Sequence, residues 1–201
     1  MWSDDVSEVG KLIILSGPSG AGKSTVVREL LANCSLPLKL SVSATTRQPR
    51  AGEVDGRDYH FVSHEEFRRV RAAGEFLECK EVFGRGDWYG TLASEVENGL
   101  AAGNWMILEI DVQGALAVMQ QRPDVLSFFV HPGSLEELAR RLRLRGTDSE
   151  EAIQRRLEVA ADELQALGNY QFEIINREVE QSVAEICQIL EKQHVLGAKH
   201  A

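Results

Sequence analysis

One stretch near the amino terminus contains the residues that polyphosphate chemistry needs, at the spacing that it needs. The run Gly17-Pro-Ser-Gly-Ala-Gly-Lys-Ser24 matches G-x-x-x-x-G-K-[ST]. Its glycines allow the backbone to form a tight nest whose N–H groups point at a polyphosphate. Lys23 is long enough to reach the β- and γ-phosphates, and the Ser24 hydroxyl can bind Mg²⁺. We therefore expect a site for a nucleoside triphosphate and Mg²⁺, formed by Gly17, Pro18, Ser19, Gly20, Ala21, Gly22, Lys23, Ser24 and Thr25.

A second set of phosphate-binding side chains follows between residues 43 and 59. Four hydrogen-bond donors occur in this short stretch, on Ser43, Arg47, Arg50 and Tyr59. Each guanidinium group is a planar fork that matches phosphate oxygens. Pro49 stiffens the turn between the two arginines, so a fixed loop can present both of them to one target. Two anion sites on one small chain indicate a donor phosphate and an acceptor phosphate.

Alternating strand and helix patterns predict the elements that must position these residues. An apolar run at 11–15 precedes the glycine-rich loop, and apolar residues at helical spacing follow from 23 to 33. Capping boxes at Ser63 and Ser134 each open a helix, and the first of these helices should end at Gly74. This order indicates a parallel sheet covered on both faces. Further strands are expected at 38–43, 76–82, 105–111, 125–130 and 172–175, a turn at 84–87, and further helices at 94–102, 113–120, 147–167 and 179–191.

Composition limits the classes of protein to which the chain can belong. Its 201 residues suit one α/β domain, and 43% hydrophobic with 26% charged residues is typical of a soluble globular protein. The net charge of −9 argues against a general nucleic-acid binder. Three widely spaced cysteines predict free thiols and a cytoplasmic location. We expect no membrane partner, because no apolar run reaches spanning length and no signal peptide is evident.

Four motifs together resemble the guanylate kinase family over about residues 11–190. The phosphate loop is Gly-Pro-Ser-Gly-x-Gly-Lys-Ser-Thr, and Ile-Asp-x-Gln-Gly and Arg-x-x-x-Arg-Gly lie further along the chain. The most specific motif begins at Ser43 and reads Ser-x-Thr-Thr-Arg-x-Pro-Arg-x-Gly-Glu-x-x-Gly-x-x-Tyr-x-Phe. The resemblance implies the reaction ATP + GMP ⇌ ADP + GDP with Mg²⁺, in purine nucleotide metabolism and GMP recycling.

The resemblance also implies an α/β fold in three parts: a P-loop core, an inserted GMP-binding lobe and a helical lid. The segment that would form the lobe is too polar for a core and too rich in functional groups for a linker. The kinase-like domain would cover residues 11–196. Its core is expected at about 11–40, 93–140 and 168–196, its lobe at about 41–92 and its lid at about 141–167, with flexible termini at 1–10 and 197–201.

Carried over by position, the resemblance assigns a role to each candidate residue. The implied GMP-binding residues are Ser43, Arg47, Arg50 and Tyr59 for the phosphate, Glu78 and Asp111 for the guanine edge, and Thr91 for the 6-oxo group. The implied catalytic residues are Lys23, Arg47, Arg141, Arg145 and Arg156, of which the last three belong to the lid and phosphate clamp. Asn176 would lie near the ATP base. Ser24 is the implied Mg²⁺ ligand, and Glu109 is a further candidate.

The chemistry of guanine agrees independently with two of these roles. Guanine presents N1–H and N2–H₂ as donors, and an ionised carboxylate is an acceptor only. Adenine lacks these donors, so Glu78 and Asp111 would be left unpaired beside it. A site built in this way can discriminate by roughly 10⁴-fold. Asp111 also ends an apolar strand, where ligands gather in α/β sheets.

Phosphoryl transfer needs positioning and positive charge more than acid–base residues. A phosphate monoester has a second pKa of about 6, so the acceptor is already largely dianionic and we assign no general base. Lys23, Mg²⁺ and the lid arginines would neutralise the charge of the transition state. Arg141 and Arg145 share a helical face. Arg156 comes from the next helix, so closure would bring it in and exclude water.

Three features depart from the family pattern. Glu109 stands where many members have Asp, so its role near Mg²⁺ is open. The loop at 83–91 is longer than usual, which affects the placing of Thr91. Asn176 is followed by Arg177-Glu178 instead of an acidic pair, which bears on the adenine side.

Three other functions remain as alternatives. A non-catalytic module of the same family would have lost its phosphate loop, whereas Lys23 and Ser24 are intact. A P-loop GTPase would explain Asp111-Val-Gln-Gly114 as D-x-x-G, but the chain contains no N-K-x-D motif. A related kinase could use another acceptor, such as a ribose bisphosphate or another nucleoside monophosphate. Glu78 and Asp111 together argue against this last alternative.

Overall fold

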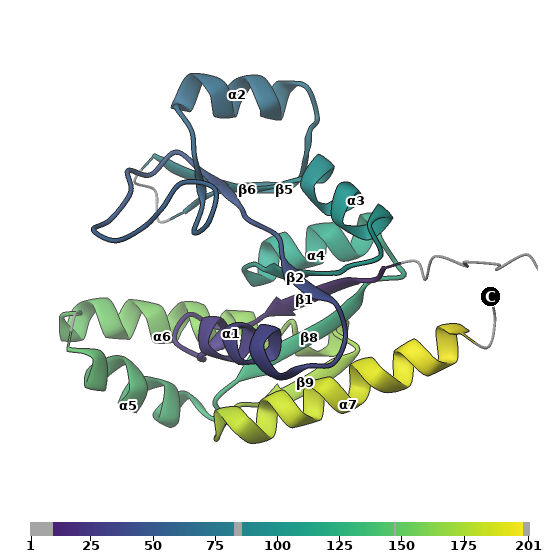
Figure 1. Ribbon diagram of the computed structural model, residues 1–201. Helices are drawn as coiled ribbons and strands as arrows, with labels where there is room; N and C mark the ends of the chain where they lie inside the picture. Colours follow the sequence, from purple (N-terminus) through teal and green to yellow (C-terminus); the bar gives the residue numbers. More distant parts are fainter. Residues whose placement is uncertain (1–9, 83–85, 147, 199–201) are drawn as a thin grey trace, which may run out of the picture.

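The apolar runs of the sequence form a five-stranded parallel sheet in the order β2-β7-β1-β8-β9 (Figure 1). The computed structural model describes residues 10–82, 86–146 and 148–198. The strands of this sheet are β1 (Leu12–Ser16), β2 (Leu38–Leu40), β7 (Trp105–Glu109), β8 (Leu126–His131) and β9 (Phe172–Ile175). A smaller sheet contains β3 (Ala44–Thr45), β4 (His60–Phe61), β5 (Phe76–Val82) and β6 (Asp87–Leu92). The helices are α1 (Lys23–Asn33), α2 (His64–Ala72), α3 (Ala93–Ala101), α4 (Val112–Gln121), α5 (Leu135–Arg145), α6 (Glu150–Leu164), η1 (Leu167–Asn169) and α7 (Val179–Ala198).

Strand β1 is buried along its whole length, because helices cover both faces of the sheet. Its side chains alternate between two hydrophobic cores. Ile13 and Leu15 belong to the core that includes residues of α1 and α7. Leu12 and Ile14 belong to the core that includes residues of α3 and α4. The expected α/β fold with a parallel sheet flanked by helices is therefore confirmed.

The small lobe projects from the core sheet beyond α3 and α4 (Figure 1). Its sheet has the order β4-β3-β6-β5. Strands β3 and β4 are parallel, whereas β6 runs antiparallel to both β3 and β5. Helix α2 starts as the capping box predicts, since the Ser63 hydroxyl accepts a hydrogen bond from the Glu66 N–H at 3.1 Å.

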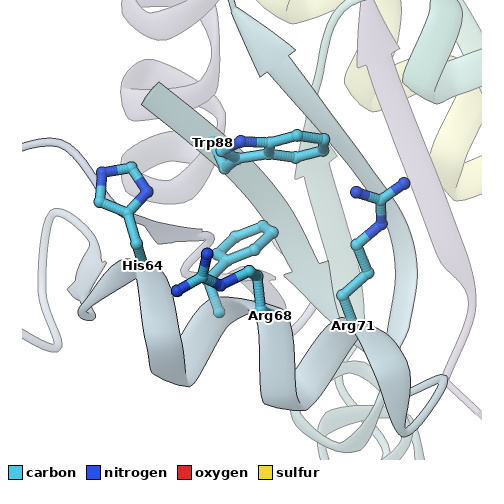
Figure 2. A pocket seen from close by; sticks show the side chains of 5 residues that line it. His64, Arg68, Arg71 and Trp88 are labelled. Atoms are coloured by element: carbon cyan, nitrogen blue, oxygen red, sulfur yellow. The ribbon is translucent and has the colours of Figure 1, made fainter. Parts of the chain in front are cut away.

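The β5–β6 hairpin has two chemically different faces, because successive side chains of a strand alternate. A β-bulge between Phe76 and Glu78 shifts the register, so these two side chains lie on opposite faces. On the side of α2, Phe67 stacks on Phe76 with the ring centroids 4.5 Å apart. Trp88 contributes to the same side, where Figure 2 shows its indole beside three side chains from α2. These three side chains are His64, Arg68 and Arg71. Together with Phe67 and Trp88 they line a cavity of about 190 Å³. The opposite face of the hairpin carries Glu78, Lys80, Tyr89 and Thr91.

Helices α5 and α6 pack on each other and have a small hydrophobic core of their own. This core is formed by Leu138, Leu142, Ile153 and Ala160. The predicted serine cap at Ser134 is confirmed, because its hydroxyl accepts a hydrogen bond from the Glu137 N–H at 3.2 Å. The helical pair corresponds to most of the segment that the sequence assigns to a lid.

Several predicted boundaries differ from the structure for identifiable reasons. The strand expected at 38–43 ends at Leu40, because the Val42 N–H is bonded to the Glu95 carboxylate at 2.6 Å and residues 44–45 pair in the small sheet. The strand expected at 105–111 ends at Glu109, because Asp111 caps α4. The predicted turn at 84–87 lies partly outside the described residues, and Asp87 already belongs to β6. Residues 87–92 were not expected to form a strand.

The ends of the domain also differ from expectation. Gly10 is buried, and a Cβ there would lie 1.9 Å from the Asn104 carbonyl oxygen. Helix α7 continues to Ala198, past its predicted end at Glu191. The other residues of the expected flexible termini, 1–9 and 199–201, lie outside the described residues, as does Thr147. Within the described ranges, no helix is both long and apolar enough to cross a membrane.

Candidate active site

The glycine-rich loop joins β1 to α1 at the carboxyl ends of the core strands. Gly17, Gly20 and Gly22 have φ angles of 134°, 96° and 92°, which side chains disfavour. A Cβ on Gly17 would lie 2.1 Å from the Val130 carbonyl oxygen, so only glycine fits there. No side chain caps the amino terminus of α1. Its first N–H groups therefore remain available to an anion.

Lys23 folds back over this loop. Its ammonium donates hydrogen bonds to the carbonyl oxygens of Gly17 at 2.6 Å and Pro18 at 3.0 Å. Burial lowers the pKa of Lys23, and the nearby charges of Glu109, Glu163 and Asp111 oppose that shift. The lysine therefore lies where the loop, α1 and a group of carboxylates meet.

Ser24 and Glu109 form a pair beside the lysine. The Ser24 hydroxyl donates a hydrogen bond to the Glu109 carboxylate at 2.5 Å. Glu109 ends β7 next to β1, so the sheet fixes this position. A hydroxyl and a carboxylate oxygen suit Mg²⁺, which usually keeps several waters and binds substrate phosphates as well. Among the described residues, no group of three or more His, Cys, Asp or Glu side chains could hold a metal by itself. A magnesium site at Ser24 and Glu109 would therefore need the phosphates and waters as further ligands.

Hydrogen bonds from Asn176, which follows β9, and from Arg141 on α5 hold the loop in place. The Asn176 amide donates to the Ala21 carbonyl at 2.8 Å and accepts from the Ser182 hydroxyl at 3.1 Å. Arg141 donates to the Asn176 carbonyl at 2.7 Å and to the Glu137 carboxylate at 2.8 Å. The buried Asn176 side chain is thus engaged with the phosphate loop.

An open cavity of about 340 Å³ lies beside the loop. Six of the sequence-predicted residues line it: Gly20, Gly22, Thr25, Arg141, Arg145 and Asn176. The charge of Arg145 also contributes to lowering the pKa of Lys23. Arg156 is not among the residues that line this cavity, and its guanidinium lies 3.3 Å from the Asp148 carboxylate. The structure therefore brings two of the three lid arginines to the loop.

On the small lobe, two side chains hold the Arg47 guanidinium in place. Its two terminal nitrogens donate to the Glu53 carboxylate at 2.9 and 3.0 Å, and Nε donates to the Tyr89 hydroxyl at 3.0 Å. The ring centroid of Tyr59 lies 5.4 Å from the guanidinium carbon. Glu53 also accepts a hydrogen bond from the Arg50 N–H at 2.6 Å, so this carboxylate links the Arg47 side chain to the main chain at Arg50.

Ser43 and Tyr59 complete this end of the lobe. The Ser43 carbonyl accepts a hydrogen bond from the His60 N–H at 3.0 Å, which joins the two sides of the arginine loop. Burial raises the pKa of Tyr59, so its hydroxyl stays protonated and able to donate.

Glu78, Thr91 and Asp111 meet where the lobe faces α4. The Thr91 hydroxyl donates to Glu78 Oε1 at 2.7 Å. Asp111 caps α4 by accepting from the Gly114 N–H at 2.8 Å. A Cβ on Gly114 would lie 2.9 Å from Glu78 Oε2 and 3.5 Å from Asp111 Oδ1, so both carboxylates border the same turn. Burial, and then the charge of Asp111, raise the pKa of Glu78.

Four residues of the site were missed by sequence reasoning. Glu53 lies within the arginine motif and Tyr89 within the loop at 83–91, so both fall in segments that the sequence analysis singled out. Lys80 could have been found from strand alternation, because it follows Glu78 by two residues. Glu163 gave no local signal; burial raises its pKa, and the charge of Lys23 opposes this. It reaches the site only through the packing of α6.

Comparisons with known proteins identify the family of the chain. The family model described as guanylate kinase matches residues 9–193. A guanylate kinase from Rhodopirellula baltica is 60% identical over 191 residues, covering 94% of this chain and 90% of the relative. One from Desulfitobacterium hafniense is 47% identical over 195 residues, covering 92% and 96%. A crystal structure of guanylate kinase from Anaplasma phagocytophilum matches with a TM-score of 0.73 and 37% identity, covering 93% and 87%. The chain therefore belongs to the guanylate kinase family.

Proposed function

We propose that this protein transfers the γ-phosphoryl group of ATP to GMP, giving ADP and GDP. One observation carries the proposal: two carboxylates that suit the guanine edge, Glu78 and Asp111, lie at the same turn of α4, on the side of the molecule where the phosphate loop opens. Family membership supports it, as does the separate arginine fork on the lobe. A donor nucleotide and an acceptor nucleotide each have a chemically suitable site.

On the donor side, the loop N–H groups and the amino terminus of α1 bind the ATP phosphates. Lys23 exchanges its carbonyl partners for phosphate oxygens when ATP binds. Ser24 and Glu109 are the residues that would hold Mg²⁺, which neutralises phosphate charge when bound. Arg141 and Arg145 border the cavity beside the loop and bind the rest of ATP, and Asn176 fixes the loop that they share.

On the acceptor side, Arg47, Arg50, Ser43 and Tyr59 bind the phosphate of GMP. The Arg47 fork already accommodates a carboxylate in a bidentate arrangement, and phosphate has a matching geometry. Because Glu53 is the present partner, the phosphate of GMP either joins this ion pair or replaces the carboxylate. No residue needs to act as general base, since the acceptor phosphate is already dianionic.

Guanine is bound by Glu78 and Asp111, which accept hydrogen bonds from N1–H and N2–H₂. Arg156 and the α5–α6 pair form the mobile part, and closure over the nucleotides excludes water. The division into core, lobe and lid follows the boundaries given above. The cytoplasmic location and the absence of nucleic-acid or membrane partners remain predictions.

The experiment that tests this function is a coupled ADP-release assay with ATP and Mg²⁺ and each of GMP, AMP, CMP and UMP. Turnover with GMP and not with the other three is the expected result. Lys23→Met should abolish turnover, while the surface variant Lys39→Met on β2 should retain it. Binding of ATP or GMP without turnover of any acceptor would favour a non-catalytic module, and turnover with another acceptor would favour a related kinase.

A further inference from the structure

The guanine side of the site contains a cation that the family resemblance does not assign. In the hairpin register Lys80 pairs with Tyr89, and Glu78 pairs with Thr91. Strand alternation places Lys80 and Glu78 on the same face. The Lys80 ammonium lies 2.8 Å from Asp111 Oδ2, and the two side chains are 37% and 35% exposed. A ligand can therefore reach both partners of this ion pair.

Thr91 is not a free donor at this position. Its hydroxyl already donates to Glu78 Oε1 at 2.7 Å, and a hydroxyl has a single O–H to give. While this hydrogen bond persists, the 6-oxo group of guanine needs another donor. A lysine ammonium has three N–H groups, so Lys80 retains donors after pairing with Asp111.

We propose that Lys80 is a specificity-determining residue that donates a hydrogen bond to O6 of GMP while Asp111 Oδ2 accepts one from N1–H. This inference rests on the proposed function. Lys80 and Asp111 present a donor beside an acceptor, and guanine presents O6 as an acceptor beside N1–H as a donor. Lysine also donates to guanine O6 when proteins read DNA, where it contacts O6 together with N7. Adenine places an amino donor at position 6, so Lys80 also acts against the wrong base.

The charge of Lys80 has a second effect in the same direction. It opposes the rise in the pKa of Glu78 that burial causes. It acts in the same way on Glu163, together with Lys23. Lys80 thus helps to keep the neighbouring carboxylates ionised, and ionised carboxylates are the acceptors that guanine requires.

The test compares the wild type, Lys80→Met and Lys80→Arg with GMP and with 6-thio-GMP, whose sulfur is a weak acceptor. Lys80→Met should raise KM for GMP about ten- to a hundredfold and leave kcat nearly unchanged. It should also lose most of the wild-type preference for GMP over 6-thio-GMP and increase relative turnover of AMP. Lys80→Arg, which keeps a cationic donor, should retain that preference. Lys39→Met removes the same charge from β2 and should change none of these ratios.

Two outcomes would overturn the proposal. One is an unchanged KM for GMP in Lys80→Met; the other is a raised KM with an undiminished preference for oxygen over sulfur, which would mean that Lys80 only positions Asp111. A loss of ATP affinity in Lys80→Met would signal misfolding. In that case Lys80→Arg decides the proposal: it should keep the wild-type preference for GMP over 6-thio-GMP. Failure of the wild type to phosphorylate GMP in this assay would instead remove the proposed function itself.

Discussion

The phosphate loop and the arginine loop of the small lobe, the two proposed phosphate sites, are held in place in opposite ways. The loop uses main-chain N–H groups whose directions are fixed by glycine conformations and by contact with β8. The lobe uses the Arg47 side chain, whose direction is fixed by an ion pair with Glu53 and a hydrogen bond to Tyr89. The first site is determined by local backbone geometry. The second is held by charges that an incoming phosphate must join or replace, so it should tolerate substitution better.

The largest effect is expected for Gly17→Ala, because a Cβ would lie 2.1 Å from the Val130 carbonyl oxygen. The loop must then move, and a displacement of about 1 Å near the chemistry can cost about a hundredfold in rate. We expect kcat/KM for ATP to fall by at least about that factor. Gly52→Ala is the matched control on the lobe, since it has a φ of 88° and an open surrounding. Equal losses in both variants would contradict the contrast between the two regions.

Glu78→Gln should raise KM for GMP about a hundredfold with little change in kcat, because an amide turns a donor toward guanine N–H groups. Asp111→Asn should act in the same direction. Unchanged affinity for GMP in both variants would show that the base does not bind at these carboxylates. Steady-state kinetics with ATP held at saturation measures this.

The same residue gives an opposite prediction for stability. The pKa of Glu78 is raised in the folded state. Between the unfolded-state and folded-state pKa values, the folded protein therefore binds more protons than the unfolded chain. The stability that protonation gives is present at low pH and is lost as pH rises through the folded-state pKa. At pH 7 the ionised side chain is unfavourable in its buried position. Glu78→Gln should therefore raise the thermal unfolding midpoint at pH 7, measured without ligand by calorimetry.

The raised pKa of Glu78 also predicts how GMP binding depends on pH. Only the ionised carboxylate is purely an acceptor toward the guanine N–H groups, so KM for GMP should rise as pH falls through this pKa. The loss should begin at a higher pH than an ordinary glutamate would give. The phosphate of GMP also titrates, with a second pKa of about 6, and this titration is the same with the wild type and with Glu78→Gln. The difference between the log KM values for GMP of the wild type and of Glu78→Gln therefore isolates the titration of Glu78. If this difference does not change with pH, Glu78 does not bind guanine.

The smallest effect is expected for Glu53→Gln, which removes the charge that holds Arg47. Loss of this preorganisation should raise KM for GMP by about three- to tenfold, while KM for ATP stays constant. A fall in KM for GMP would have a different meaning: Glu53 would then compete with the phosphate for Arg47. Isothermal titration with GMP gives the sign directly.

The sequence was sufficient for features that local chemistry determines. The strand at 76–82 and the helix at 23–33 match the structure, and the serine caps of α2 and α5 formed where predicted. Strand β6 was missed because Asp87-Trp-Tyr-Gly-Thr-Leu92 is polar and contains glycine, and it is a strand only through pairing with β5 and β3. The proximity of Glu163 to Lys23 could not be predicted, because it depends on how α6 packs.

The packing of Trp88 gives the lobe an optical property. On the side of α2, the guanidinium carbon of Arg71 lies 4.6 Å from the centroid of the Trp88 indole ring. The main chain of Trp88 bonds to the segment that leads into Arg47: its carbonyl accepts from the Thr46 N–H and the Thr45 hydroxyl, each at 3.0 Å, and its N–H donates to the Thr46 hydroxyl at 2.9 Å. A shift of the arginine loop therefore moves the indole relative to its cationic neighbour. The emission of Trp88 should report GMP binding in real time without any attached label.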